Sequence, residues 1–347
     1  RFFRKKQLLD MPDDRKAHAT PTPSSGGLIF GILAFILVPF MFSLTTYGIA
    51  IYCGVLLMIV GFFDDRYDLS AKIKFGFQII AAAITLASLG PIDLFGIELE
   101  WLNYVATFFL IIGFTNAFNL IDGVDGLAGT YATFVLVIIT VLLLIRGDFS
   151  AALYTIVLIG SLIGFLKFNL NPAKIFMGDT GSLFLGFNIS FLTIIVLKND
   201  TIFSALPYEV EDVQLMLLSL LILPMFDTLR VMGVRISKGR SPFKADRFHL
   251  HHLLGKIGLK PRNITSFFLG LTTLFMLQTF ILIQLEFSAW FILISILSVA
   301  VTTFNTLVYT RIRQHRKRMQ SHRNAIKYLA RKNYLMVRDS LSPNKIT

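Results

Sequence analysis

The sequence predicts an all-α integral membrane protein, a helical bundle that crosses the bilayer about ten times. Apolar residues make up 54% of the 347 residues and charged residues only 16%, and the mean hydropathy is +0.68. These values exclude an ordinary soluble domain. The apolar runs are continuous and lack the alternation of barrel strands, so we expect helices and not a membrane barrel.

Ten apolar segments are long enough, or nearly so, to cross a hydrocarbon core of about 30 Å. In chain order they cover residues 27–45, 47–63, 73–90, 101–118, 127–145, 149–167, 181–197, 213–228, 265–285 and 290–310. The segments 47–63, 181–197 and 213–228 are short for a span. We expect one transmembrane catalytic domain over 1–310 and a basic tail over 311–347.

The start of the chain shows no cleavable signal peptide, because four of residues 1–6 are basic and no apolar run follows before Gly26. The chain also begins without a methionine, and we expect that it has been shortened there. The single cysteine, Cys53, lies in an apolar segment, which predicts a buried thiol and excludes a disulfide framework.

The distribution of charge predicts which helix ends face the cytoplasm. If the N-terminus is cytoplasmic, the inside segments carry 31 of the 33 Lys and Arg residues, and only Arg146 and Lys198 fall outside. This is the positive-inside pattern of membrane proteins. It places both termini of this chain in the cytoplasm, with inside segments at 1–26, 64–74, 119–126, 167–180, 229–264 and 311–347.

The net charge of +12 follows from this topology and favours contact with anionic lipid over binding of nucleic acid. We expect the basic tail, 311–347, to lie along the anionic cytoplasmic leaflet. Its sequence argues for no specific protein partner, and the oligomeric state, a homodimer included, stays open.

Four clusters of polar residues interrupt the apolar sequence, all within or directly beside the predicted cytoplasmic segments. The first, DDRYDL and the residues after it, contains Asp64, Asp65, Asp68, Lys72 and Lys74. The second, NAFNLIDGVDGLAG, contains Asn116, Asn119, Asp122 and Asp125. The third, FNLNPAKIFMGDTGSLFLG, contains Asn169, Lys174, Phe176 and Asp179. The fourth begins at Asp227 and continues in KADRFHLHHLL with Asp246, Arg247, His249, His251 and His252.

The second cluster has a period of three residues, from Asn116 to Asp125. Each step of three drifts by about 60° around an ideal α-helix, so only adjacent members face the same way. Gly123 and Gly126 favour a break in the helix, so we expect Asp122 and Asp125 to lie on a turn.

The clusters combine acidic side chains at a membrane boundary with basic side chains. A carboxylate costs about 2.5–3.5 kcal/mol at the bilayer centre on insertion scales, and several together repel one another. A hard divalent cation relieves this repulsion, and Mg²⁺ usually takes one or two protein carboxylates plus phosphates and water. The Lys, Arg and His residues indicate a polyanion. The clusters therefore predict Mg²⁺ and a phosphate-bearing substrate.

In order along the chain, DDRYDL, NAFNLIDGVDGLAG, IFMGDTGSLFLG and FHLHHLL resemble the motifs of the polyprenyl-phosphate N-acetylhexosamine-1-phosphate transferases, glycosyltransferase family 4. The similarity spans residues 10–255. HLHH and the short basic loop are closer to the WecA/TagO branch than to the MraY branch. That family has eleven membrane helices, so the resemblance implies one more helix before those found here.

The resemblance implies an enzyme that transfers N-acetylglucosamine-1-phosphate from UDP-GlcNAc to undecaprenyl phosphate and releases UMP. It implies Mg²⁺ as cofactor, with Mn²⁺ as an alternative, and an active site on the cytoplasmic face of the bacterial plasma membrane. The product would start a cell-envelope polysaccharide of the O-antigen, enterobacterial common antigen or teichoic acid type. The alternative within the family is UDP-MurNAc-pentapeptide, the substrate for peptidoglycan synthesis, or another UDP-N-acetylhexosamine.

The same resemblance implies roles for individual residues. Asp179 would bind Mg²⁺ with Asp65 or Asp122, Asp125 would belong to the catalytic group, and Asp64 would orient or deprotonate the lipid phosphate. We favour orientation, because a phosphate monoester is largely ionised near neutral pH. The implied substrate contacts are Asn119, Asp122, Asn169 and Phe176 for the uridine end, Arg247, His249, His251 and His252 for the diphosphate or sugar, and Lys72 or Lys74 for the lipid phosphate. Asn116 is a further candidate for the substrate site.

Each cluster also has a structural interpretation. DDRYD is typical of a solvated helix end, and the glycines of 123–129 favour close helix packing. Asp179 follows Gly178 and is suited to cap the next helix. Asp227 is placed to pair with Arg230. HLHH is a weak candidate for Zn²⁺, since no cysteine lies nearby.

Three other classes of protein place acidic residues among membrane helices. An intramembrane Mg²⁺-dependent prenyltransferase would not need the His-rich loop. A CDP-alcohol phosphotransferase requires Ala-Arg after its first Asp-Gly, which DGVDGLAG lacks. A transporter should carry polar residues near the bilayer midplane, whereas the charge here is concentrated at one predicted face.

Overall fold

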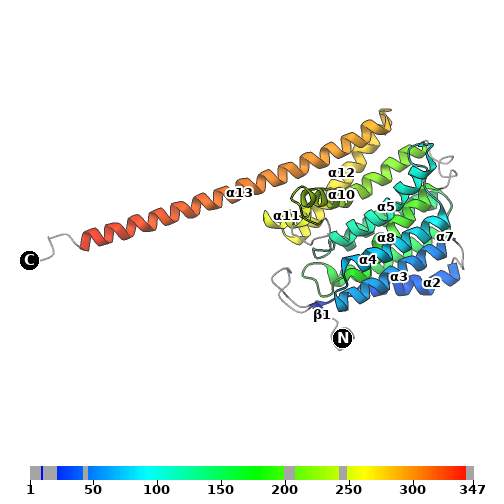
Figure 1. Ribbon diagram of the computed structural model, residues 1–347, viewed down its shortest axis with the longest axis horizontal. Helices are drawn as coiled ribbons and strands as arrows, with labels where there is room; N and C mark the ends of the chain where they lie inside the picture. The colour runs from blue at the N-terminus through cyan, green and yellow to red at the C-terminus, as the bar shows by residue number, and fades with distance from the viewer. Residues whose placement is uncertain (1–8, 11–21, 42–45, 199–207, 242–247, 341–347) are drawn as a thin grey trace, which may run out of the picture.

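The computed structural model describes residues 9–10, 22–41, 46–198, 208–241 and 248–340. Over these residues eleven α-helices form one bundle (Figure 1). They are α2 (Leu28–Met41), α3 (Thr46–Tyr67), α4 (Ala71–Leu89), α5 (Glu100–Ile121), α6 (Leu127–Ile145), α7 (Phe149–Asn169), α8 (Gly178–Leu197), α10 (Val210–Ile236), α11 (Leu250–Lys256), α12 (Pro261–Gln284) and α13 (Ala289–Ser340). Before the first described helix, β1 (Leu9–Asp10) and β2 (Thr22–Pro23) form a two-stranded antiparallel sheet.

Nine of the described helices are long and apolar enough to cross a membrane, and the apolar part of α2, Leu28–Phe40, is shorter. All ten expected segments are thus helical over most of their described residues, and residues 42–45 of the first segment lie outside the described part of the chain. The protein is a multi-pass membrane protein. The three short segments belong to α3, α8 and α10, which have 22, 20 and 27 residues. A hydropathy window stops at the first charges, whereas the backbone hydrogen bonds of a helix continue through them.

The helices therefore extend into segments that the sequence predicts as loops. α3 continues to Tyr67 and α4 begins after Ser70, whose side chain accepts a hydrogen bond from the Ile73 backbone N–H. Asp68 lies past the end of α3 with φ +53° and is exposed, whereas Asp64 and Asp65 lie in the last turn of that helix. The large basic loop begins after α10 and contains α11, which hydropathy alone does not predict.

α8 is the central helix of the bundle, buried on all sides from Thr180 to Leu197. α3 and α5 pack most extensively against it. A Cβ built on Gly61 of α3 would lie 2.3 Å from the carbonyl oxygen of Asp179. Small residues let membrane helices approach closely, and here the approach brings the end of α3 against the start of α8.

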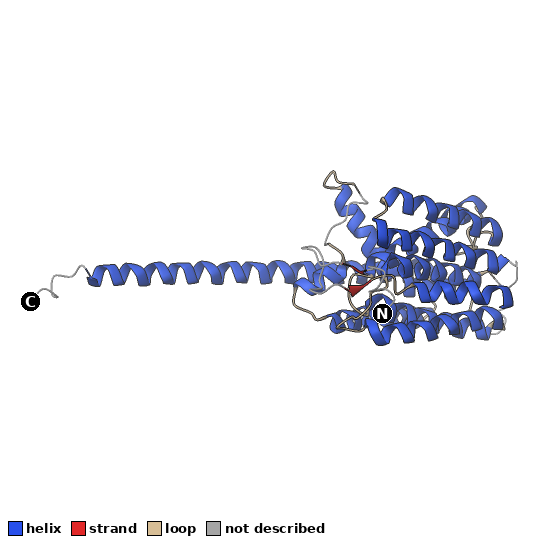
Figure 2. Ribbon diagram, turned by 90° about the horizontal axis from the view of Figure 1, so that it is seen from below, coloured by secondary structure: helices blue, strands red, loops and turns tan. Residues whose placement is uncertain are grey.

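α13 joins the last expected span and the basic tail in one helix of 52 residues. Its apolar part, Ala289–Gln314, packs on the bundle through α10, α11 and α12. The rest continues along the same axis, well beyond the other helices (Figures 1 and 2). The helix of α13 therefore continues past residue 310 without a break. Contact with anionic lipid stays a prediction.

Candidate functional site

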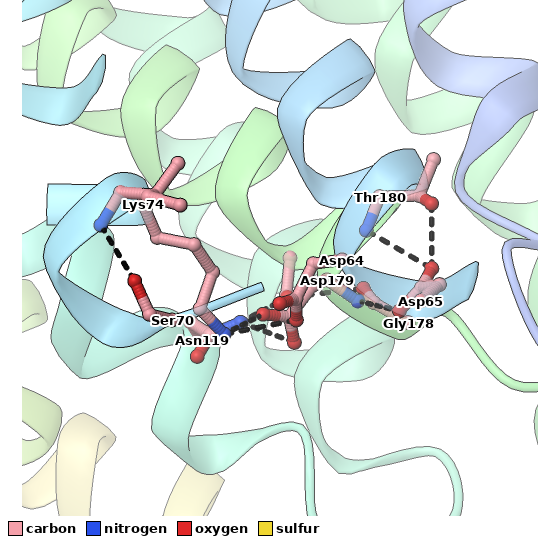
Figure 3. Close-up of polar contacts among 10 residues, drawn as sticks. Asp64, Asp65, Ser70, Lys74, Asn119, Gly178, Asp179 and Thr180 are labelled. Carbon is pink, nitrogen blue, oxygen red and sulfur yellow. Dashed lines mark hydrogen bonds and ion pairs between the residues drawn. The ribbon is translucent and has the colours of Figure 1, made fainter. Parts of the chain in front are cut away.

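Asp65, in the last turn of α3, caps the start of α8 from outside. Its Oδ1 accepts a hydrogen bond from the Asp179 backbone N–H at 2.8 Å, and its Oδ2 accepts from the Thr180 hydroxyl at 2.6 Å and from the Thr180 N–H at 3.3 Å (Figure 3). The Ser25 hydroxyl also donates to Oδ2, at 2.9 Å. The first N–H groups of a helix lack partners within it, and a carboxylate placed there also interacts favourably with the positive end of the helix dipole. Asp65 thereby fixes the position of Asp179.

Lys74 of α4 joins Asp64 of α3 to Asp179 of α8. Its Nζ lies 2.9 Å from Asp64 Oδ2 and 2.8 Å from Asp179 Oδ2. Asn119 of α5 donates to Asp179 Oδ1 at 2.9 Å and to the Ser182 hydroxyl at 2.8 Å. Four helices thus each place a polar side chain at one point (Figure 3).

Asp122 lies beside this point, on the turn where α5 ends. It accepts a hydrogen bond from the Gly178 backbone. Desolvation, followed by the negative charges of Asp179 and Asp65, raises the pKa of Asp122 well above its usual range. We call Asp64, Asp65, Asp122 and Asp179 the acidic cluster.

Asp125 shares the turn with Asp122, as expected, but makes other contacts. Its Oδ2 accepts hydrogen bonds from Asn171 Nδ2 at 2.9 Å and from the Ala173 N–H at 3.0 Å. It therefore ties the 122–126 turn to the loop that follows α7. Its catalytic role stays a prediction.

The donors of the acidic cluster are those that Mg²⁺ prefers. Within the described residues, no three carboxylate, imidazole or thiol side chains could enclose a metal ion by themselves. One or two carboxylates suffice for Mg²⁺ when phosphates and water complete its shell. Asp64 Oδ1 is buried without a hydrogen-bond partner among the described residues, so Asp64 together with Asp179 fits this donor set. The metal-binding roles of Asp65 and Asp122 stay predictions.

Two asparagines that the sequence assigns to substrate are engaged in holding the fold. Asn169 is 4% exposed, accepts from the Gly126 N–H at 3.0 Å and donates to the Ile175 carbonyl at 2.8 Å. Asn116 donates to Gln78 Oε1 at 2.5 Å. Both amides connect segments at this end of the bundle, and their predicted substrate contacts stay predictions.

The other two predicted contacts in these clusters lie closer to the surface. Lys72 is exposed, whereas Lys74 reaches the acidic cluster. Phe176 is half-buried, and its backbone exchanges hydrogen bonds with the segment before α2, from Phe176 N–H to the Pro23 carbonyl and from Gly26 N–H to the Phe176 carbonyl. Base stacking on Phe176 stays a prediction.

The histidines of the fourth cluster lie on and just before α11. The ring centroids of His251 and His252 are 4.1 Å apart, and those of His249 and His251 are 6.0 Å apart. A Cβ on Gly123 would lie 2.7 Å from His251 Nε2, so α11 packs directly on the 122–126 turn. The structure thus brings the fourth cluster to the second. Arg247 and Asp246 lie outside the described residues.

Several residues of the site were not singled out as site residues from the sequence. Ser25 and Thr180 bind Asp65, and Ser182 binds Asn119. Thr180 and Ser182 have a signal in the sequence, because MGDTGS places their hydroxyl groups at the first turn of an apolar helix. For Ser25 there is no local signal, because its partner is 40 residues away.

Residues 47–197 match the family model described as glycosyl transferase family 4. A probable undecaprenyl-phosphate N-acetylglucosaminyl 1-phosphate transferase of Bacillus subtilis is 36% identical over 266 residues, 73% of this chain and 71% of the relative. The undecaprenyl-phosphate alpha-N-acetylglucosaminyl 1-phosphate transferases of Salmonella typhi and Escherichia coli K12 are 31% and 30% identical, each over 275 residues, 74% of this chain and 71% of the relative. The motifs, their convergence at one end of the bundle and these relatives agree: the chain belongs to glycosyl transferase family 4.

Proposed function

We propose that this enzyme transfers N-acetylglucosamine-1-phosphate from UDP-GlcNAc to undecaprenyl phosphate and releases UMP. The relatives carry the name of this activity. The observation that carries the proposal is the meeting of Asp64, Asp179, Asn119 and Lys74, from four helices, around one point. Such a group of charges at the end of a membrane bundle is suited to hold two phosphate-bearing substrates.

The reaction exchanges one phosphoanhydride for another. An oxygen of the lipid phosphate attacks the β-phosphorus of the UDP-sugar, a new P–O bond forms, and the bond to UMP breaks. Because the bond made and the bond broken are alike, catalysis consists mainly of positioning two anions and neutralising charge.

In this proposal the acidic cluster holds Mg²⁺ through Asp179 and Asp64, with Asp122 beside them. When bound, the metal neutralises charge on the diphosphate. Asp65 holds Asp179 in place through the start of α8. Lys74 attracts the lipid phosphate, and Asp64 orients it. No base is required, because the second pKa of a phosphate monoester is near 6.

The remaining contacts surround this centre. Asn119, which already holds Asp179, and Phe176 would contact the uridine end. His249, His251 and His252, with Arg247 from the same loop, would contact the diphosphate or the sugar. The packing of His251 on Gly123 supports this placement, because it brings the histidines to the turn that carries Asp122.

We propose that the site end of the bundle faces the cytoplasm of a bacterial cell, at the plasma membrane. The placement of 31 of 33 Lys and Arg residues supports this orientation. The lipid-linked sugar would then be formed where UDP-sugars are made, as the first intermediate of a cell-envelope polysaccharide.

The test is UMP release by the purified full-length chain with Mg²⁺, undecaprenyl phosphate and either UDP-GlcNAc or UDP-MurNAc-pentapeptide. We expect UMP only with UDP-GlcNAc, and none after EDTA treatment or in Asp179→Asn. Asp148→Asn is the matched variant, because it changes an acid at the start of α7, at the opposite end of the bundle, and it should keep UMP release. UMP only with the pentapeptide substrate would overturn the proposed substrate, and normal release by Asp179→Asn would overturn the proposed site.

A further inference from the structure

Asp227 is a buried acid of α10 that the proposed mechanism does not use. It is 3% exposed, and both of its oxygens are engaged. Oδ2 lies 3.0 Å from His249 Nδ1 and accepts from the Leu250 N–H at 2.9 Å. Oδ1 accepts from Arg230 Nη2 at 2.7 Å and from Arg230 Nε at 3.3 Å. The acid therefore joins α10 to the start of the His-rich helix.

Arg230 makes a second connection between the same two segments. Its Nη2 also donates to the Phe248 carbonyl at 2.6 Å. The guanidinium carbon lies 3.7 Å from the centroid of the Phe304 ring of α13, within the range of a cation–π contact. Residues 248–250 are thus bound to α10 by two side chains of opposite charge, and α13 packs behind them.

These contacts determine which nitrogen of His249 carries a proton. An aspartate paired with an arginine is ionised and can only accept hydrogen bonds, so His249 Nδ1 must be the donor. The other nitrogen, Nε2, is then the atom left for a ligand. It is buried and has no hydrogen-bond partner among the described residues, although buried polar atoms are nearly always paired.

We propose that Asp227 and Arg230 are positioning residues, which hold His249 with its proton on Nδ1 so that Nε2 contacts the UDP-sugar. The identity of this ligand rests on the proposed function, whereas the protonation of His249 does not. Asp227 acts on the reaction through His249 alone, since its own oxygens face His249, Leu250 and Arg230.

The kinetic test uses Asp227→Asn, His249→Gln and the double variant. In Asp227→Asn the new side-chain amide would turn its NH₂ toward His249 Nδ1 and favour the other tautomer. We expect kcat/KM for UDP-GlcNAc to fall about 10- to 100-fold, with KM for undecaprenyl phosphate unchanged. In the His249→Gln background the same substitution should have no further effect, because residues that act through one another are not additive.

Asp148→Asn is the matched control. Asp148 caps α7 at the opposite end of the bundle, where it accepts from the Ala151 N–H at 3.1 Å and from the Tyr47 hydroxyl at 3.2 Å. This variant changes a similar capping carboxylate to an amide without touching His249, and it should keep kcat/KM. Equal losses in Asp148→Asn and Asp227→Asn, or additive losses in the double variant, would mean that Asp227 serves the fold only.

A second measurement does not depend on activity. In protein labelled with ¹⁵N-histidine, with His249→Gln used to assign the signal, the ring shifts report the tautomer of His249. We expect a proton on Nδ1 in the wild type and a shift toward Nε2 in Asp227→Asn. A wild-type ring protonated on Nε2 alone would overturn the proposal even if the enzyme is active. If the protein releases no UMP but His249 carries its proton on Nδ1 as expected, the positioning role of Asp227 is upheld and only the proposed substrate is wrong.

Discussion

Lys74 shows how a single residue can join two of the polar clusters, because it contacts Asp64 of the first and Asp179 of the third. It lies between Asp64 and Asp179, whose carboxylates would otherwise repel each other across a partly desolvated gap. The sequence leaves Lys72 and Lys74 as equal candidates for the lipid phosphate. The helical phase of α4 distinguishes them, because it turns Lys74 into the bundle and leaves Lys72 exposed.

We expect Lys74→Met to abolish UMP release and to lower the melting temperature in the absence of Mg²⁺. The remaining carboxylates would lack a counter-charge, and added Mg²⁺ should restore part of the stability. Thermal unfolding in detergent with and without Mg²⁺ measures this. Lys72→Met is the matched variant and should unfold as the wild type does. Identical behaviour of the two variants would contradict the assignment of Lys74.

The buried ring of His251 should make the free energy of unfolding depend on pH. Desolvation, with His252 and His249 close by, lowers the pKa of His251 from 6.5 to about 3. Because the folded pKa is below the unfolded one, the neutral ring stabilises the fold above pH 6.5, and this contribution is lost as the pH falls toward 3. The free energy of unfolding should fall by up to about 1.4 kcal/mol per pH unit in this window.

We expect His251→Gln to have a flatter pH dependence of unfolding than the wild type between pH 6.5 and 5. Equilibrium unfolding at several pH values, in the same detergent, checks this. Parallel curves for the two proteins would show that the ring is not held neutral by the fold.

Among the elements, the contact between α3 and α8 determines the geometry of the site. α8 begins at Gly178, with φ +71°, and its first residue after that glycine is Asp179. Asp65 caps this turn, and Gly61 allows the backbones to approach. The acidic cluster therefore depends on the distance between two helices as much as on the acids themselves.

We expect Gly61→Ala to reduce both stability and UMP release. Its Cβ would lie 2.3 Å from the Asp179 carbonyl oxygen and 2.6 Å from the Thr180 nitrogen, and backbone atoms cannot move aside as side chains do. Gly76→Ala in α4 is the control, because nothing lies within 4 Å of its Cβ. Thermal unfolding and the UMP assay check both variants. Full activity in Gly61→Ala would mean that the helices can separate without cost to the site.

On the scale of the whole molecule, segments distant in sequence meet at one end of the bundle. α3, α5 and α10 end there, and α4 and α8 begin there. α13 passes this end and continues as a helix for about 40 Å beyond its apolar part, at 1.5 Å per residue. The polar clusters therefore lie together at one end of the bundle.

The orientation of the bundle can be tested by labelling single cysteines from outside the cell. In a Cys53→Ala background, we expect Glu100→Cys, at the start of α5, to react with a membrane-impermeant maleimide. Ser237→Cys, just after α10, should react only after the membrane is opened. Both positions are exposed and lie at opposite ends of the bundle. The reverse pattern would contradict a cytoplasmic site.

The sequence alone determined the class of the protein, its ten helical segments, the turn at Asp122 and the four clusters that carry the site. Hydropathy is a local property, and a continuous apolar run has few structures other than a helix in a membrane. The motifs were equally local, and the family followed from them.

Only the tertiary structure decided what each polar residue contacts. Asp65 and Asp179 are 114 positions apart, and Asp227 and His249 are 22 apart, so neither contact has a local signal. The structure alone shows that Asp125 and Asn169 join loops, that Lys74 and not Lys72 reaches the acids, and that α13 continues without a turn. The physical reason is that burial and hydrogen bonding depend on which helices pack together, and this packing is a property of the whole chain.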